Sequence, residues 1–291
     1  MNPSWGRKNL CLTLLLAAVA SGDAACSVIV EPNRQQCSVD ADCAARGAAF
    51  AGTTCVESVC VPAPPMVDPV WGCLGHVVWP PARVAKVTVT AQFRDAVTGK
   101  PLTGVVVDVC RKQDFACADP IAAGLRPADT GDLAFQVDAG FNGFLQMNLP
   151  GALPGLFFFY PPVTEDRVLV GVPLLSKDTL DTIAALAGKP YLPEKGVALL
   201  AAMDCRNQFA EGVHISSADA DQDTTAFYVV NQIPSSSATF TDTSGQGGLY
   251  NLPPRSVTIQ GTLQDGRKVG TVSVVVRPGG VTYTSLVPAP N

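Results

Sequence analysis

The chain has 291 residues, of which 47% are hydrophobic and 15% are charged, and this balance is typical of a folded protein rather than a disordered one. Its formal net charge of −5 at pH 7 argues against nucleic-acid binding, because neutralising phosphates requires an excess of Lys and Arg. The 26 glycines and 24 prolines favour short strands between turns. Its 10 cysteines indicate disulfides formed in an oxidising compartment.

Residues 1–25 have the composition of a signal peptide. Arg7 and Lys8 precede a short apolar run, and small residues follow it, as in secretory leaders. Two processing routes are open. Ala18-Val19-Ala20 fits ordinary secretion, whereas Asp23-Ala24-Ala25-Cys26 resembles a bacterial lipobox, in which the cysteine is acylated and becomes the new N-terminus.

The cysteine count favours lipidation. Loss of Cys11 with the leader leaves 10 − 1 = 9 cysteines, and an unpaired thiol is a liability in an oxidising compartment. Acylation of Cys26 leaves 9 − 1 = 8, all able to pair. Ser27 after it resembles the outer-membrane-sorted class of Gram-negative lipoproteins. The sequence therefore predicts an outer-membrane lipoprotein facing the periplasm or the exterior, held by acyl chains, with a secreted protein as the alternative.

Residues 26–62 form a disulfide-rich module that is too small to bury a core of its own. We expect two disulfides, each stabilising the module by about 2–4 kcal/mol, among Cys37, Cys43, Cys55 and Cys60, with all three pairings open. Zinc is the alternative, although the Cys37–Cys43 spacing is wider than in zinc knuckles. The module resembles small knotted spacers of Gram-negative surface lipoproteins. Residues 63–70 follow as a proline-rich, semi-rigid linker.

The remainder of the chain indicates an all-β protein with two tandem transthyretin-like or Ig-like sandwiches, residues 71–165 and 196–288. Short alternating strands separated by turns recur in both parts. Val87–Val109 predicts a hairpin, and Val197–Ile215 is a weaker copy of it. We therefore interpret the chain as one repeated β unit.

Residues 166–195 are expected to connect the sandwiches and to contain one helix. Leu180, Ile183, Ala184 and Ala187 have the spacing of an apolar helical stripe. Asp178 is the expected N-cap, and the helix should end before the following glycine and proline.

Residues 95–107 read Asp-Ala-Val-Thr-Gly-Lys-Pro-Leu-Thr-Gly-Val-Val-Val, and residues 241–259 contain a Thr-Asp-x-x-Gly turn followed by Asn-Leu-Pro. This pattern resembles the carboxypeptidase-regulatory-like domain, a transthyretin-like β-sandwich, over residues 85–160 and 196–285. Arg255 stands where that family commonly has Gly. The resemblance implies a fold and constrains function little.

Four cysteines lie within the two sandwiches. Cys110 and Cys117 bracket six residues, and we expect them to form a local disulfide. By elimination, Cys73 would then pair with Cys205 and tie the first sandwich to the second.

The sequence offers no catalytic motif. Neither His76 nor His214 begins a His-x-x-Glu zinc motif, and a Gly-x-Ser-x-Gly elbow is absent from the sequence. Asp219, Asp221 and Asp223 resemble the start of a calcium loop, but Thr224 and Val230 replace the Gly and Glu of an EF-hand. A looser calcium site and a solvated loop are the two interpretations. Three aromatic residues, Trp71, Trp79 and Tyr160, are candidates for stacking sugars or for core packing.

We therefore predict a non-enzymatic cell-envelope lipoprotein with a structural, adhesive or scaffold role. It would need no cofactor and would contact the membrane through its lipid and an unknown protein or glycan through its surface. The alternative is an extracellular carbohydrate- or peptide-binding module assisted by calcium. An accessory domain of a secreted hydrolase is a third interpretation.

Overall fold

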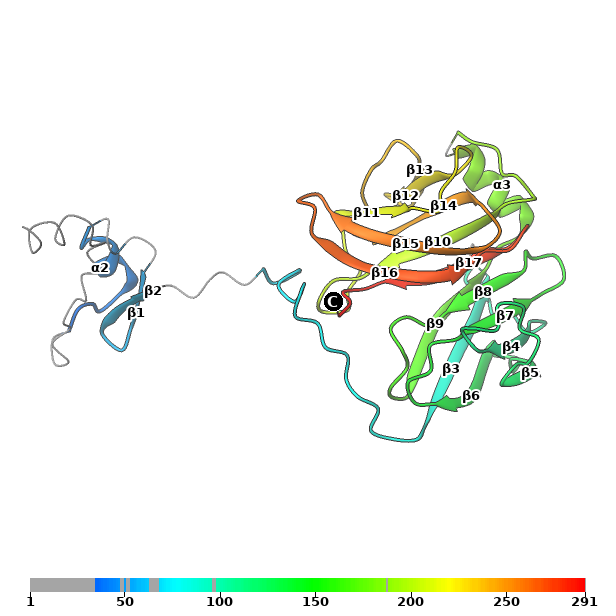
Figure 1. Ribbon diagram of the computed structural model, residues 1–291, viewed down its shortest axis with the longest axis horizontal. Helices are drawn as coiled ribbons and strands as arrows, with labels where there is room; N and C mark the ends of the chain where they lie inside the picture. The colour runs from blue at the N-terminus through cyan, green and yellow to red at the C-terminus, as the bar shows by residue number, and fades with distance from the viewer. Residues whose placement is uncertain are drawn as a thin grey trace, which may run out of the picture. The chain divides into compact units, whose positions relative to one another are not determined.

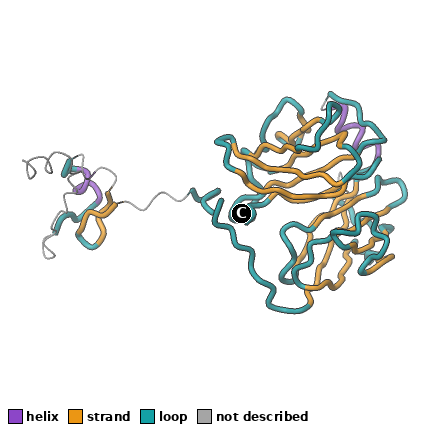
Figure 2. The backbone as a smooth tube through the Cα atoms, in the orientation of Figure 1, coloured by secondary structure: helices purple, strands orange, loops and turns teal. Residues whose placement is uncertain are grey.

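The computed structural model describes residues 35–47, 50, 53–62, 68–95, 98–186 and 188–290. The chain divides into two compact units, the first ending at Val67 and the second beginning at Asp68, and each is described by itself (Figures 1 and 2). The predicted leader, Cys26 and most of the proline-rich linker lie outside the described residues. In the described part of the chain, the helices are too short or too polar to span a membrane.

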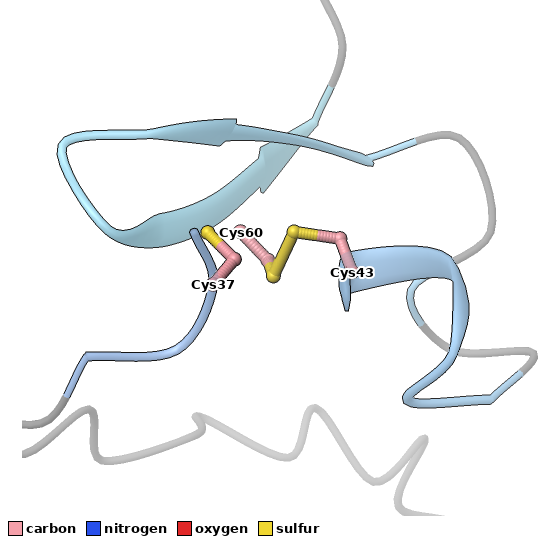
Figure 3. A group of neighbouring side chains, drawn as sticks. All are labelled: Cys37, Cys43 and Cys60. Carbon is pink, nitrogen blue, oxygen red and sulfur yellow. A yellow bond between two sulfur atoms is a disulfide. The ribbon is translucent and has the colours of Figure 1, made fainter. Parts of the chain in front are cut away.

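The first unit is a small module held by two disulfides. Its helix α2 (Asp40–Ala44) precedes a hairpin of β1 (Thr53–Val56) and β2 (Val59–Pro62). Disulfides join Cys37 to Cys55 and Cys43 to Cys60 across separations of 18 and 17 residues. The sulfur atoms of Cys37, Cys43 and Cys60 lie within 4.8 Å of one another (Figure 3). Each of these three sulfurs is already part of a disulfide, Cys37 with Cys55 and Cys43 with Cys60, so none is a free thiolate that could bind zinc.

The second unit is almost entirely β. Its elements, in chain order, are β3 (Lys86–Asp95), β4 (Val106–Cys110), β5 (Ala122–Leu125), β6 (Asp132–Asp138), β7 (Phe144–Asn148), β8 (Gly155–Phe158), β9 (Arg167–Leu174), α3 (Lys177–Leu186), β10 (Gly196–Ala202), β11 (Val213–Ser217), β12 (Thr225–Val230), β13 (Ile233–Ser235), β14 (Gln246–Leu252), β15 (Ser256–Leu263), β16 (Lys268–Val275) and β17 (Val281–Leu286). The all-β class predicted from the sequence is confirmed.

These strands form one large sheet and two small ones. The large sheet has nine strands in the order β13-β12-β14-β10-β17-β8-β7-β4-β5, and the small sheets are β11-β15-β16 and β6-β3-β9. Figure 1 shows the second half of the unit above the first, with β17 next to β8 where they meet.

The strand order repeats. In the first half β3 pairs antiparallel with β6 and parallel with β9, and in the second half β10 pairs antiparallel with β14 and parallel with β17. The other layer of each repeat matches as well. In the first repeat it is formed by β4, β7 and β8 of the nine-stranded sheet, and in the second by the sheet β11-β15-β16. Both are antiparallel. The repeat seen in the sequence is therefore also a repeat of topology.

The two halves are not independent sandwiches, because β17 completes both. Val281 and Tyr283 of β17 belong to the core of the first repeat, whereas Leu286 belongs to the core of the second. Successive side chains of a strand point to opposite faces. The small sheets β6-β3-β9 and β11-β15-β16 therefore cover opposite faces of the shared nine-stranded sheet.

The predicted hairpins are wrong. β3 lies in a small sheet while β4 lies in the nine-stranded sheet, and β10 and β11 are separated in the same way. Each predicted hairpin is an arch that crosses from one layer to the other. Alternating apolar residues indicate that one face of a strand is buried. They do not identify which strand pairs with it.

The predicted connector, residues 166–195, contributes a strand. Arg167–Leu174 forms β9 at the edge of the first repeat, with Leu169, Val172 and Leu174 buried. Helix α3 follows at Lys177–Leu186. Its N-cap is Ser176 and not Asp178, because the Ser176 hydroxyl accepts a hydrogen bond from the Thr179 N–H at 3.1 Å.

Residues 71–74, which the sequence assigns to the first sandwich, pack on the second repeat instead. Trp71 is buried with Ala202, Val213 and Leu263. We call residues 68–85, which run from this contact to the start of β3, the strap.

Candidate functional site

A recess of about 740 Å³ lies on the second repeat beside the Cys73–Cys205 disulfide. Four segments meet there: the start of the strap, the loop between β10 and β11, the loop between β13 and β14, and the turn between β15 and β16. Its lining residues are Asp68, Val70, Trp71, Asp204, Arg206, Phe209, Ala210, Glu211, Gly212, Thr243, Leu263, Gln264, Asp265 and Arg267.

The disulfide positions the strap against the loop that follows β10. Cys73 and Cys205 are 132 residues apart in sequence and 5.8 Å apart at their Cα atoms. Next to the bond, the Cys205 N–H donates to the Val70 carbonyl at 3.1 Å. Trp71 packs on the buried apolar side chains of the second repeat beneath the recess. The disulfide and these apolar contacts therefore both hold the start of the strap in place.

Asp204 organises one wall of the recess. Its side chain is almost fully buried, and it accepts the Arg206 and Gln208 N–H groups at 2.7 and 3.0 Å. The Arg206 guanidinium adds two bonds, from Nε at 2.9 Å and from a terminal nitrogen at 2.7 Å. Burial by itself raises the pKa of the Asp204 carboxyl, but the hydrogen bonds from Gln208 and Arg206 outweigh it, and the pKa is lowered.

Arg267 joins the opposite wall to the strap. Its Nε donates to Asp265 at 2.7 Å, and a terminal nitrogen donates to Asp68 at 3.2 Å. Asp68 also accepts the Val70 and Trp71 N–H groups. The Trp71 bond, followed by that of Val70, holds the pKa of Asp68 below its usual value.

Three carboxylates of the recess, Asp68, Asp204 and Asp265, are paired with arginines. The fourth, Glu211, is exposed. The recess also presents to solvent a Phe209 side chain that is 56% exposed and the free N–H groups of two partly exposed guanidinium groups, Arg206 and Arg267. These groups can stack on and hydrogen-bond a polar ligand.

Replacing Asp204 by Asn is expected to lower the free energy of unfolding by about 1–3 kcal/mol at pH 7, because buried hydrogen bonds to a charge are lost. The lowered pKa means that Asp204 stabilises the fold above its unfolded-state pKa, near 4, and that this stability is lost as the pH falls through the folded-state pKa. Urea titrations at pH 7 and pH 2.5 measure both effects, and the difference between the variant and the wild type should shrink at the lower pH.

Asp265→Asn is the matched control. Asp265 stands two residues before its arginine as Asp204 does, but its side chain is 52% exposed, so we expect a much smaller loss, because solvent screens the ion pair. Equal losses for the two variants, or an Asp204→Asn loss that does not change with pH, would contradict the role given to Asp204.

The eight predicted disulfide cysteines of the described part all pair. Besides the two bonds of the first unit, Cys110 is joined to Cys117 and Cys73 to Cys205, which are the pairs expected from the sequence. The lipidation residue Cys26 lies outside the described residues.

The structure does not bring Asp219, Asp221 and Asp223 together. Asp221 and Asp223 both bind the Lys195 Nζ, at 2.5 and 3.4 Å, and the Asp221 bond is the main reason that the pKa of Lys195 is raised. Asp219 faces elsewhere, accepting the Thr258 N–H at 2.8 Å and lying 3.4 Å from Arg255. The carboxylate oxygens that a calcium ion would need are occupied by protein cations and N–H groups.

The histidines and the aromatic candidates are placed apart from the recess, except for Trp71. His214 contacts the Thr239 carbonyl and the Tyr228 hydroxyl, and His76 is exposed. Trp71 forms the floor and is only 8% exposed. Trp79 and Tyr160 pack edge to face at 5.3 Å.

Reasoning from the sequence missed the acidic and basic residues of the recess. A usable signal was present, because Asp204-Cys205-Arg206 and Asp265-Gly266-Arg267 share an Asp-x-Arg pattern in two turns. Their convergence with Asp68 depends on the strap, which the local pattern does not reveal.

Comparison with known proteins adds little to this picture. No family model and no curated protein matches the chain. Among solved structures it is similar to the Bacillus anthracis TIE protein, with 12% identity, a TM-score of 0.25 and coverage of 70% of this chain and 34% of that one. It is also similar to BcpA, the major pilin subunit of Bacillus cereus, with 10% identity, a TM-score of 0.26 and coverage of 70% and 100%.

A third similar structure is the shaft pilin SpaA of Lactobacillus rhamnosus GG, with 13% identity, a TM-score of 0.21 and coverage of 71% and 98%. The chain spans about a third of the TIE protein's length. TM-scores this low carry no argument about this chain. The resemblance to the carboxypeptidase-regulatory-like domain rests on the motif residues named above.

Proposed function

We propose that this protein is a non-enzymatic structural or adhesive protein of the cell envelope, held at the outer membrane by acyl chains on Cys26. The observation that carries the proposal is the nine-stranded sheet shared by both repeats. Two sandwiches that share a sheet cannot rotate independently, so the second unit is a stiff body suited to presenting a surface rather than to closing around a substrate.

The cysteines support an exported location. All eight cysteines of the described part are paired in four disulfides, as expected where thiols are oxidised. This leaves Cys26 without a partner among them once Cys11 is removed with the leader. Acylation would use the remaining thiol and would provide the membrane anchor.

The deciding experiment is an intact mass of the mature protein from the membrane fraction, with thiol alkylation before and after reduction. We expect a chain that begins at Cys26, carries two or more acyl groups and has no free thiol until it is reduced. A soluble product beginning near Ser21, with one free or intermolecular thiol, would exclude the anchor.

A second candidate function, carbohydrate binding, is favoured by the exposed Phe209 beside two arginines in the recess. An aromatic face stacks on a sugar ring while guanidinium groups donate to its hydroxyls. If calcium assisted the binding of a carbohydrate, Lys195 would have to release Asp221 and Asp223. Measuring carbohydrate binding with and without millimolar calcium tests this form of the proposal.

A glycan array probed with the wild type, Phe209→Ala and Phe115→Ala tests this candidate. Phe115 is also about half exposed, at 50%, but lies outside the recess, so only Phe209→Ala should abolish a specific signal. Binding that survives Phe209→Ala would place any glycan site elsewhere.

A further inference from the structure

The recess beside the Cys73–Cys205 disulfide carries an excess of negative charge. Two guanidinium groups and four carboxylates line it, which gives these groups a net charge of −2. They are Arg206, Arg267, Asp68, Asp204, Glu211 and Asp265. A concave surface lined mainly by one sign of charge attracts ligands of the opposite sign and repels those of its own. The lining therefore favours a cationic ligand over an anionic one.

The two arginines do not turn the recess into an anion site, because both are already paired. Arg206 donates to Asp204 through two nitrogens, at 2.9 and 2.7 Å. Arg267 is shared, since it donates to Asp265 at 2.7 Å and to Asp68 at 3.2 Å. Asp265 and Asp68 are both partly exposed. Two carboxylates that share one guanidinium keep part of their negative charge uncompensated at the surface of the recess.

Glu211 is the second source of the excess charge. It is exposed, and within the described part of the chain it forms no ion pair or side-chain hydrogen bond. Burial alternates along this segment, because Ala210 is buried between the exposed residues Phe209 and Glu211. Side chains two residues apart on an extended chain point to the same side and are about 7 Å apart. Phe209 and Glu211 therefore face the recess together.

Backbone hydrogen bonds on either side hold this pair in place. The Ala210 N–H donates to the Ala202 carbonyl at 3.0 Å, and the Gly212 N–H donates to the Thr241 carbonyl at 2.9 Å. The segment is thus fastened to the end of β10 and to the loop before β14. An aromatic ring and an unpaired carboxylate are presented on a backbone that needs little ordering when a ligand binds.

An aromatic ring beside a carboxylate is complementary to an ammonium group next to an apolar surface. The face of the ring attracts a cation within about 6 Å of its centroid, and the carboxylate accepts a charge-assisted hydrogen bond. An amino sugar offers both features, because its ring face can stack on Phe209 while its ammonium reaches Glu211. The free N–H groups of the two arginines would then donate to its hydroxyls.

We propose, building on the carbohydrate-binding candidate for this recess, that its ligand is a glycan of amino sugars whose amines are free and not acetylated. Two neighbouring sugars of this kind would supply the two positive charges that the lining lacks. Acetylation removes the charge of each amine and leaves Glu211 unpaired. An acidic glycan adds negative charge to a recess that already has an excess, so it is excluded by repulsion.

Isothermal titration calorimetry of the full mature chain tests this specificity with three tetramers: glucosamine, N-acetylglucosamine and galacturonic acid. At slightly acidic pH, where the glucosamine amines are charged, we expect the glucosamine tetramer to bind at least about tenfold more tightly than its acetylated form. The galacturonic acid tetramer should not bind. Raising sodium chloride from about 0.05 to 0.5 M should weaken binding of the glucosamine tetramer only, because salt screens charges.

Glu211→Gln locates the recognition of the amine. It should weaken binding of the glucosamine tetramer about tenfold and leave binding of the acetylated tetramer unchanged. Glu194→Gln is the matched control, since Glu194 is also exposed but lies outside the recess. Thermal melts of both variants confirm that the fold is intact before the comparison.

Equal binding of the free-amine and acetylated tetramers, or undiminished binding of the glucosamine tetramer by Glu211→Gln, would overturn the amino-sugar assignment and leave the carbohydrate-binding candidate standing. If none of the three tetramers bound, the assignment would be wrong and the carbohydrate-binding candidate would lose its support as well. Binding of a lysine tetrapeptide in place of the glucosamine tetramer would assign the recess to a basic peptide.

Discussion

Replacing Cys73 and Cys205 together by serine is expected to lower the free energy of unfolding of the second unit by about 5 kcal/mol. The bond closes a separation of 132 residues, and cross-linking a long loop removes the most entropy from the unfolded chain. Nothing else covalent holds the strap, whose residues form no strand among those described. Urea titration followed by circular dichroism measures the loss.

The matched control is the double serine variant of Cys110 and Cys117. That bond spans only 7 residues, so the chain-entropy term is about 2 kcal/mol. Limited proteolysis adds a local readout, because only the first variant should be cleaved in the strap between residues 74 and 85. If both double variants lost the same stability and the strap stayed resistant, the disulfide would not be what holds the strap.

Tyr283→Ala is expected to destabilise both repeats at once, by about 3–5 kcal/mol, which is the usual cost of removing a large buried aromatic side chain. Tyr283 is 5% exposed and lies in the core of the first repeat although it belongs to a strand of the second. Burial raises the pKa of its hydroxyl, so the side chain stays neutral at physiological pH. A cavity here weakens the junction of β17 with β8, through which the nine-stranded sheet continues from one repeat to the other.

Amide exchange distinguishes this effect from a local one. In Tyr283→Ala we expect β3 and β15, one from each repeat, to lose protection together, because contiguous cooperative units open as a whole. Phe115→Ala, at a half-exposed aromatic residue, should change stability by less than about 1 kcal/mol. Loss of protection in β15 alone would mean that the repeats fold separately.

Parts of this fold are readable from the sequence because they depend on neighbours along the chain. Leu156 to Tyr160 form an apolar run that predicts a strand buried on both faces, and β8, which covers the first part of this run, lies inside the nine-stranded sheet. The helix around Leu180 follows from its apolar stripe, and Gly188 ends it as expected, since the Gly188 and Lys189 N–H groups bond back to Ala185 and Ala184. The sequence did not predict β9, because its exposed residues Val168 and Val170 are apolar. The strand therefore lacks the alternation of apolar and polar residues that indicates a half-buried strand.

The sequence alone predicted the all-β class, the repeated unit and the Cys110–Cys117 disulfide, with Cys73–Cys205 following only by elimination, because strand periodicity, turn chemistry and short cysteine spacings are local properties. Only the tertiary structure decided that the repeats share a sheet, that the start of the strap packs on the second repeat, and that Asp68, Asp204 and Arg267 meet in one recess. Strand order and long-range charge pairing depend on which surfaces become buried together, and a pattern of alternating residues is the same whichever strand lies beside it.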